Sequence, residues 1–162
     1  MPALGVIVAV LVVVVDQLSK WWILDYFTTG ILIVEVTPFF NIVLVMNRGM
    51  SFGLVPIEAW WGPWLFAGIA AFIVAMLGVW LARAERPLLA LAIGLVIGGA
   101  VGNVIDRLRY GGVVDFLDFY LGAYHWPAFN AADTAIVCGV AALIYASLFQ
   151  DRDHHYNKGP GE

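Results

Sequence analysis

The chain has 162 residues, 62% of them hydrophobic and 12% charged, with a mean hydropathy of +0.89 and a net charge of −4. An ordinary soluble domain is about 45–50% apolar, so this composition excludes a soluble fold and indicates a small multi-pass membrane protein, while the negative charge argues against nucleic acid as a partner. The single cysteine, Cys138, leaves no partner for an internal disulfide and no ligands for a cysteine-based metal cluster.

Four segments reach the length of about 20 mostly apolar residues that a transmembrane helix needs. The first has no Lys or Arg before its apolar core and no small-x-small motif after it, so we expect a retained helix rather than a cleaved signal peptide. The second contains no charged residue, whereas the fourth contains Asp133. The predicted helices cover about 4–24, 60–82, 88–105 and 131–149.

The connections between these spans differ in length and composition. Two short β-branched and aromatic runs, ILIVEV and FFNIVLVMN, are bounded by Gly and Pro and predict a hairpin or small sheet over 30–58. Residues 106–127 contain three glycines and a proline among aromatic residues, and they predict an ordered loop. Residues 1–150 therefore form one integral-membrane domain, followed by a polar tail over 151–162.

Basic residues do not orient the chain in the membrane. If the turn at 83–86 and the C-terminal tail lie inside, the positive-inside rule counts four basic residues on each side. The inside set is Arg83, Arg86, Arg152 and Lys158, and the outside set is Lys20, Arg48, Arg107 and Arg109. The charge count thus leaves the orientation open.

Antiparallel packing of four spans brings polar side chains from three of them to one side of the membrane. These residues end the first and third spans or begin the fourth: Asp16, Lys20, Asn103, Asp106, Arg107, Asn130 and Asp133. An ionisable group inside a span costs about 2.5–3.5 kcal/mol on insertion scales and marks function by default. Their shared depth predicts a single site near one membrane face.

Some of these charges also have a purely structural interpretation. Asp16 and Lys20 are four residues apart on one helix face, which favours an ion pair and structural support. Asp106 and Arg107 stand where a helix ends at the lipid headgroups. Asn103 and Arg107 also share one helix face, which suits the binding of a peptide carbonyl or carboxylate.

The small residues within the spans favour close helix packing. Glycines at 94, 98 and 102 form a stripe of four-residue spacing with Gly99 beside it. We expect Cys138 to be a buried packing residue about halfway along the fourth span. We expect His125, beside a tryptophan, at the membrane interface and not in catalysis, since it has no serine or cysteine partner.

Two carboxylates remain as candidates for chemistry. Asp115 and Asp133 are both flanked by apolar residues. If two such groups meet, they cannot both ionise comfortably, so one keeps its proton and the other acts as a base. A small proton-coupled transporter would use the same residue types in a proton relay, and this alternative stays open at this point.

Five short motifs, read in order, carry a resemblance. They are DQLSK at 16–20, NRGMSF at 47–52, GGAVGNVIDR at 98–107, VVDF at 113–116 and FNAAD at 129–133. Together with four spans, the ordered set resembles the lipoprotein signal peptidase family, also called signal peptidase II, which are bacterial membrane aspartyl proteases.

The resemblance implies a fold, a location and a substrate. The implied fold is mainly α, with four transmembrane helices, a small extracytoplasmic β-sheet cradle and a flap-like loop within 106–127. Both termini are implied to be cytoplasmic, with the site at the outer leaflet of the bacterial inner membrane. The implied substrates are diacylglyceryl-modified prolipoproteins, cleaved before the lipidated cysteine. No metal or cofactor is implied, and we expect a monomer in contact with membrane lipid.

The resemblance also implies roles for individual residues. Asp115 and Asp133 form a catalytic dyad that activates water. Substrate binding and orientation of the dyad are assigned to Asn47, Asn103, Arg107 and Asn130. The remaining positions, Asp16, Lys20 and Gly99, are expected to give structural support.

Overall fold

The computed structural model describes residues 1–30, 33–49 and 61–149 of the chain. Its four long helices are all apolar enough to cross a membrane, which confirms the four predicted spans and the membrane fold class. The helices are α1 Pro2–Tyr26, α2 Gly62–Ala82, α3 Pro87–Tyr110 and α4 Ala131–Phe149, with a short 3-10 helix, η1 Phe27–Thr29, after α1. The strands are β1 Ile33–Thr37, β2 Phe40–Asn47, β3 Val113–Leu121 and β4 Tyr124–His125.

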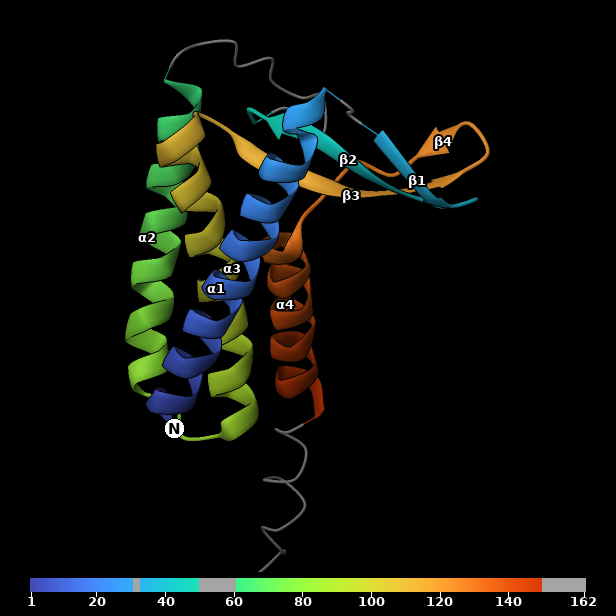
Figure 1. The fold of residues 1–162 in the computed structure, drawn as a ribbon. Helices are drawn as coiled ribbons and strands as arrows, with labels where there is room; N and C mark the ends of the chain where they lie inside the picture. The colour runs from blue at the N-terminus through green and yellow to red at the C-terminus, as the bar shows by residue number, and fades with distance from the viewer. Residues whose placement is uncertain (31–32, 50–60, 150–162) are drawn as a thin grey trace, which may run out of the picture.

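The helices run side by side, and the sheet extends from one end of the bundle above α4 (Figure 1). Met1 and the end of α4 lie at the opposite end of the bundle, where the short turn between α2 and α3 also lies. Large apolar side chains such as Leu11, Phe72 and Val137 point outward and are exposed, as expected for helices whose solvent is lipid.

α3 packs against the other three helices and is the most buried of the four. Its glycines permit close approach, because a Cβ at Gly98 would lie 2.7 Å from the carbonyl oxygen of Ala9 in α1. On another side of α3, a Cβ at Gly99 would collide with the carbonyl oxygen of Ala132 in α4. The predicted glycine stripe therefore does pack against a neighbouring helix, and Gly99 sets the approach of α4.

The sheet is antiparallel, in the order β1-β2-β3-β4. It is anchored on the end of α1, where Ile23 and Phe27 pack with Val114 and Phe116 of β3 in a buried cluster. The pairing of β2 with β3 is irregular between Ile42 and Val45. This arrangement holds the first half of β3 directly over the ends of the helices.

The prediction for residues 106–127 needs correction. They are not a loop: α3 continues to Tyr110, and β3 is the longest strand in the described part of the chain. Gly111 ends α3 in the left-handed conformation, with φ of 67°, and the following β-branched and aromatic residues pair along β2. The predicted sheet within 30–58 is confirmed for β1 and β2, whereas residues 50–58 and the tail over 151–162 lie outside the described residues.

Candidate functional site

A cavity of about 570 Å³ opens where the end of α3 and the start of α4 meet β2 and β3. Both predicted catalytic carboxylates, Asp115 and Asp133, line it. Three of the residues predicted to bind substrate also line it, namely Asn47, Asn103 and Arg107. The fourth, Asn130, is fully buried and contacts both carboxylate-bearing residues through hydrogen bonds. The fold thus brings Asn47 of β2 together with residues of α3, β3 and the start of α4, which lie more than 50 positions later in the sequence.

Asp115 lies on β3 and is only 2% exposed. Its two oxygens accept hydrogen bonds from two side-chain amides, Asn47 Nδ2 at 3.0 Å and Asn130 Nδ2 at 2.7 Å. Asn47 is itself oriented, because its Oδ1 accepts a hydrogen bond from the backbone N–H of Gly49 at 3.0 Å. The carboxyl group is therefore held from two sides.

Asp133 lies in the first turn of α4 and is held by the way that helix begins. Asn130 precedes the helix, and its Oδ1 accepts from the backbone N–H of Asp133 at 2.9 Å. In return, Asp133 Oδ2 accepts from the backbone N–H of Asn130 at 3.2 Å. This reciprocal pair is a capping box, and the positive end of the helix dipole also favours a carboxylate there. The other oxygen, Oδ1, accepts from Asn103 Nδ2 at 2.8 Å.

Arg107 faces the cavity. Its guanidinium group donates from Nη1 to the carbonyl oxygen of Asn103 at 3.2 Å and lies 5.8 Å from the ring centre of Phe66. It also interacts electrostatically with Asp133 and Asp115. Arg107 therefore lies inside α3, which continues to Tyr110, and on the cavity wall, as a residue that binds substrate would.

The environment of Asp115 changes its titration. Burial raises the pKa of Asp115 to about 6, and the charge of Asp133 acts in the same direction. The hydrogen bonds from Asn47 and Asn130 and the charge of Lys20 act in the opposite direction. A carboxyl group with this pKa is suited to exchange protons near neutral pH beside a second carboxylate.

An ion cluster lies next to the cavity. Lys20 is buried, and its Nζ lies 2.9 Å from Asp16 Oδ2, as the spacing on one helix face predicts. The same Nζ lies 2.8 Å from Asp106 Oδ2. The alternative interpretation, in which Asp106 simply ends a helix at the headgroups, does not fit, because Asp106 is fully buried and paired within the bundle. No sequence spacing signals this pair, since its partners are far apart in the chain.

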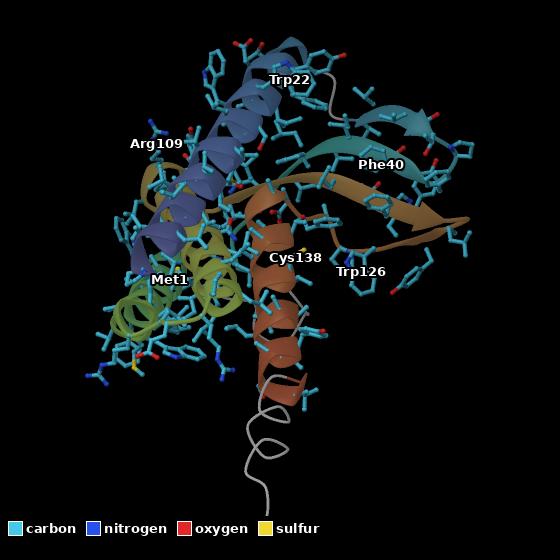
Figure 2. All side chains as sticks on the ribbon, turned by 90° about the horizontal axis from the view of Figure 1, so that it is seen from below. Met1, Trp22, Phe40, Arg109, Trp126 and Cys138 are labelled. Atoms are coloured by element: carbon cyan, nitrogen blue, oxygen red, sulfur yellow. The ribbon has the colours of Figure 1, made fainter. Side chains whose placement is uncertain are left out.

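Nine further residues, all but Thr134 apolar or weakly polar, line the cavity and were not predicted from the sequence. They are Val113, Trp126, Pro127, Ala128, Phe129, Thr134, Ile136, Val137 and Cys138. Cys138 is exposed and lines the cavity, so its assignment as a buried packing residue is wrong (Figure 2). Helical periodicity could have identified this position. Cys138 lies four residues after Thr134, so the two share one face of α4, and that face begins next to Asp133.

His125 lies outside this cavity lining. It is half-exposed on β4, and its Nδ1 lies 2.9 Å from both oxygens of Asp118. Asp118 also accepts a hydrogen bond from Asn41 Nδ2 at 3.0 Å. In the described ranges, no three His, Cys, Asp or Glu side chains are grouped so that they could hold a metal ion.

The chain matches known proteins over most of its length. The family model described as "Signal peptidase (SPase) II" matches residues 8–149. A lipoprotein signal peptidase of Cupriavidus taiwanensis is 46% identical over 158 residues, which cover 94% of this chain and 87% of that protein. The corresponding protein of Burkholderia thailandensis is 44% identical over 148 residues, which cover 91% and 87%.

Solved structures show the same fold. One structure of a bacterial membrane enzyme has a TM-score of 0.75 and 33% sequence identity, covering 90% of this chain and 92% of that one. A second has a TM-score of 0.76 and 32% identity, covering 98% and 93%. The similarity therefore includes both the helices and the sheet.

The raised pKa of Asp115 predicts a pH-dependent loss of stability. Because the pKa lies above the ordinary value of 3.8, the protonated form is favoured in the folded state, and this contribution is lost as pH rises through about 6. We expect Asp115→Asn to remove up to about 3 kcal/mol of this dependence. In thermal unfolding of purified protein, the difference in Tm between variant and wild type should grow in the variant's favour from pH 4 to pH 7. A constant difference would contradict the raised pKa.

Proposed function

Because the chain belongs to the signal peptidase II family, we propose that it removes signal peptides from diacylglyceryl-modified prolipoproteins. The bond hydrolysed is the peptide bond immediately before the lipidated cysteine. One observation carries the proposal: Asp115 on β3 and Asp133 on α4 converge on one cavity at the end of the membrane spans. The proposed enzyme is thus an aspartic endopeptidase whose site lies at the membrane surface.

The two carboxyl groups hold and activate a water molecule between them. One carboxylate takes a proton from the water as its oxygen attacks the carbonyl carbon of the scissile bond, while the other carboxyl group protonates the carbonyl oxygen. The C–N bond of the tetrahedral intermediate then breaks: the leaving amine takes the proton that the first carboxylate received from water, and the proton on the former carbonyl oxygen returns to the other carboxylate. The protons are shared by the pair, and neither is assigned to one residue.

The polar groups around the dyad orient it and the substrate. Asn47 and Asn130 donate to Asp115, and Asn103 donates to Asp133, so the oxygens of both carboxyl groups are oriented before substrate binds. The guanidinium group of Arg107 offers charged donors to the substrate backbone at the cavity wall.

The wall of the cavity that α4 forms suits a lipid-modified substrate. It continues along the lipid-facing side of α4 through Ile136, Val137 and Cys138, away from Asp133. Acyl chains of a diacylglyceryl group can lie there while the peptide enters below the sheet. An anchored substrate then reaches the dyad without leaving the membrane.

The ionisable groups within the described spans favour a protease over a proton-coupled transporter. Asp, Glu, Lys and Arg residues of α1, α3 and α4 all lie in the half of the bundle nearer the sheet, and α2 has none. A transporter needs such groups near the midplane with access from both sides. The described spans offer no such series.

Replacing either member of the dyad should abolish cleavage. We expect Asp115→Asn and Asp133→Asn each to lower turnover of a diacylglyceryl-modified precursor by at least about 10³-fold, because one proton-transfer partner is lost. Asp118→Asn is the matched control, since Asp118 is a buried carboxylate on the same strand but outside the cavity lining. Cleavage is measured on gels with purified, folded protein, with the unmodified precursor as a second substrate.

Near-normal turnover by either dyad variant would contradict the assignment. Equal cleavage of the modified and unmodified precursors would contradict the proposed substrate.

In the bacterial inner membrane, the proposed orientation puts the sheet at the outer leaflet and both termini in the cytoplasm. Exported substrates carry their lipidated cysteine at that face. In a Cys138→Ala background, Leu121→Cys, at the 83% exposed last position of β3, should react with a membrane-impermeant thiol reagent added to intact cells. Glu85→Cys, between α2 and α3, should react only after the membrane is opened. The reverse pattern would invert the orientation.

A further inference from the structure

The buried ion cluster of Asp16, Lys20 and Asp106 makes more contacts than an ion pair requires. Lys20 Nζ is surrounded by three acceptors, namely Asp16 Oδ2 at 2.9 Å, Asp106 Oδ2 at 2.8 Å and Asn103 Oδ1 at 3.0 Å. Three acceptors satisfy the three N–H donors of the buried ammonium group, but neutralising its charge needs a single carboxylate, which Asp16 on the same helix already supplies. The second carboxylate, Asp106, therefore points to a further role.

Both carboxylates of the cluster also hold a backbone amide. Asp16 Oδ1 accepts from the N–H of Ala132 at 3.0 Å, and Asp106 Oδ2 accepts from the N–H of Val114 at 3.1 Å. Ala132 directly precedes Asp133, and Val114 directly precedes Asp115. Each carboxylate thus fixes the main chain one residue before a member of the proposed dyad.

A third contact reaches the dyad through a side chain. Because Lys20 donates to Asn103 Oδ1, the amide of Asn103 is turned so that its Nδ2 donates to Asp133 Oδ1 at 2.8 Å. Without the ammonium group, this amide would lose the charge-assisted hydrogen bond that fixes its orientation. One cation is therefore connected to Asp133 through Asn103 and through Asp16, and to Asp115 through Asp106.

We propose that Lys20, Asp16 and Asp106 are positioning residues that fix the position of Asp115 relative to Asp133. The proposal rests on the proposed function, since it takes these two aspartates as the catalytic pair. It gives α1 a specific part in the reaction, although no described residue of α1 lines the cavity. The cluster joins α1 and α3 to the first residues of β3 and α4, the two elements that carry the dyad.

Asp106 offers the sharpest test, because two substitutions separate its hydrogen bond from its charge. Asp106→Asn can keep one oxygen at the place of Oδ2, where it accepts from both Val114 N–H and Lys20, but it loses the hydrogen bond that Oδ1 accepts from Gln17 Nε2 at 2.9 Å. Asp106→Leu removes that acceptor and leaves Lys20 paired with Asp16, so neither variant leaves the ammonium without a carboxylate. Asp106→Ala removes the same acceptor without adding volume and replaces the leucine variant if that variant is not recovered folded.

We expect folded Asp106→Asn to keep kcat within about threefold of the wild-type value, because the backbone contact survives. We expect the leucine or alanine variant to lose about 10²-fold in kcat with little change in KM, because the substrate site is present but the two carboxyl groups are misaligned. Both constants are measured on the diacylglyceryl-modified precursor and divided by the folded fraction, well below each Tm.

Gly94→Ala is the matched control for a loss of stability alone. A Cβ there would collide with the backbone of Gly5 at the opposite end of the bundle, so Tm should fall while kcat per folded molecule stays unchanged. If kcat of the leucine and alanine variants also stays unchanged, the cluster is only structural and the proposal fails. An equal loss of kcat in all three Asp106 variants would assign the effect to the lost charge and not to the backbone contact. That result would also overturn the proposal.

Failure of this inference is distinguishable from failure of the proposed function. If Asp115→Asn and Asp133→Asn abolish cleavage while all Asp106 variants are active, the dyad stands and the positioning role falls. If the dyad variants are themselves active, the proposed function is contradicted, and the positioning role is contradicted with it.

Discussion

A charged group buried in a membrane protein needs partners of opposite charge or hydrogen-bond acceptors. At Lys20 this requirement fixes the relative positions of several elements of the fold. Its ammonium group is buried among Asp16, Asp106 and Asn103, which come from two helices. Removing one partner from such a cluster leaves an uncompensated buried charge, so the cluster holds its helices in a fixed relation. The glycines of α3 make this possible, because they let α1 and α4 approach closely enough for short hydrogen bonds.

The two members of the proposed dyad lie on different elements, and different local interactions hold each of them. Asp133 belongs to the capping box that begins α4, so its side chain is ordered by the same contacts that satisfy the free N–H groups of a helix end. Asp115 lies on a strand anchored by Ile23 of α1 and Phe27 of η1. The end of α1 thus contacts the strand that carries Asp115, and Asp16 of α1 accepts a hydrogen bond from Ala132, the residue before Asp133.

The spans, the convergence of polar residues and the placement of Asp115 and Asp133 in one cavity could be predicted, because composition, helical spacing and short motifs are local signals. β3 could not, since the glycines that flank it and the aromatics within it are equally typical of a loop, and its pairing with β2 is a long-range contact. Asp106 was misread for a similar reason: its partner Lys20 is 86 residues away in the sequence, which a rule based on i, i+4 spacing cannot detect. Cys138 was misplaced because hydropathy cannot distinguish a lipid-facing position from a packed one.

The most direct test of the dyad is a crystal structure with a lipid-modified precursor peptide whose scissile amide is replaced by a hydroxyethylene group. Such a hydroxyl occupies the place of the attacking water in the tetrahedral intermediate. The account predicts that it lies between Asp115 and Asp133, within about 2.5–3.0 Å of an oxygen of each. A hydroxyl that contacts only one of these carboxyl groups, or neither, would contradict the claim that the two share the chemistry.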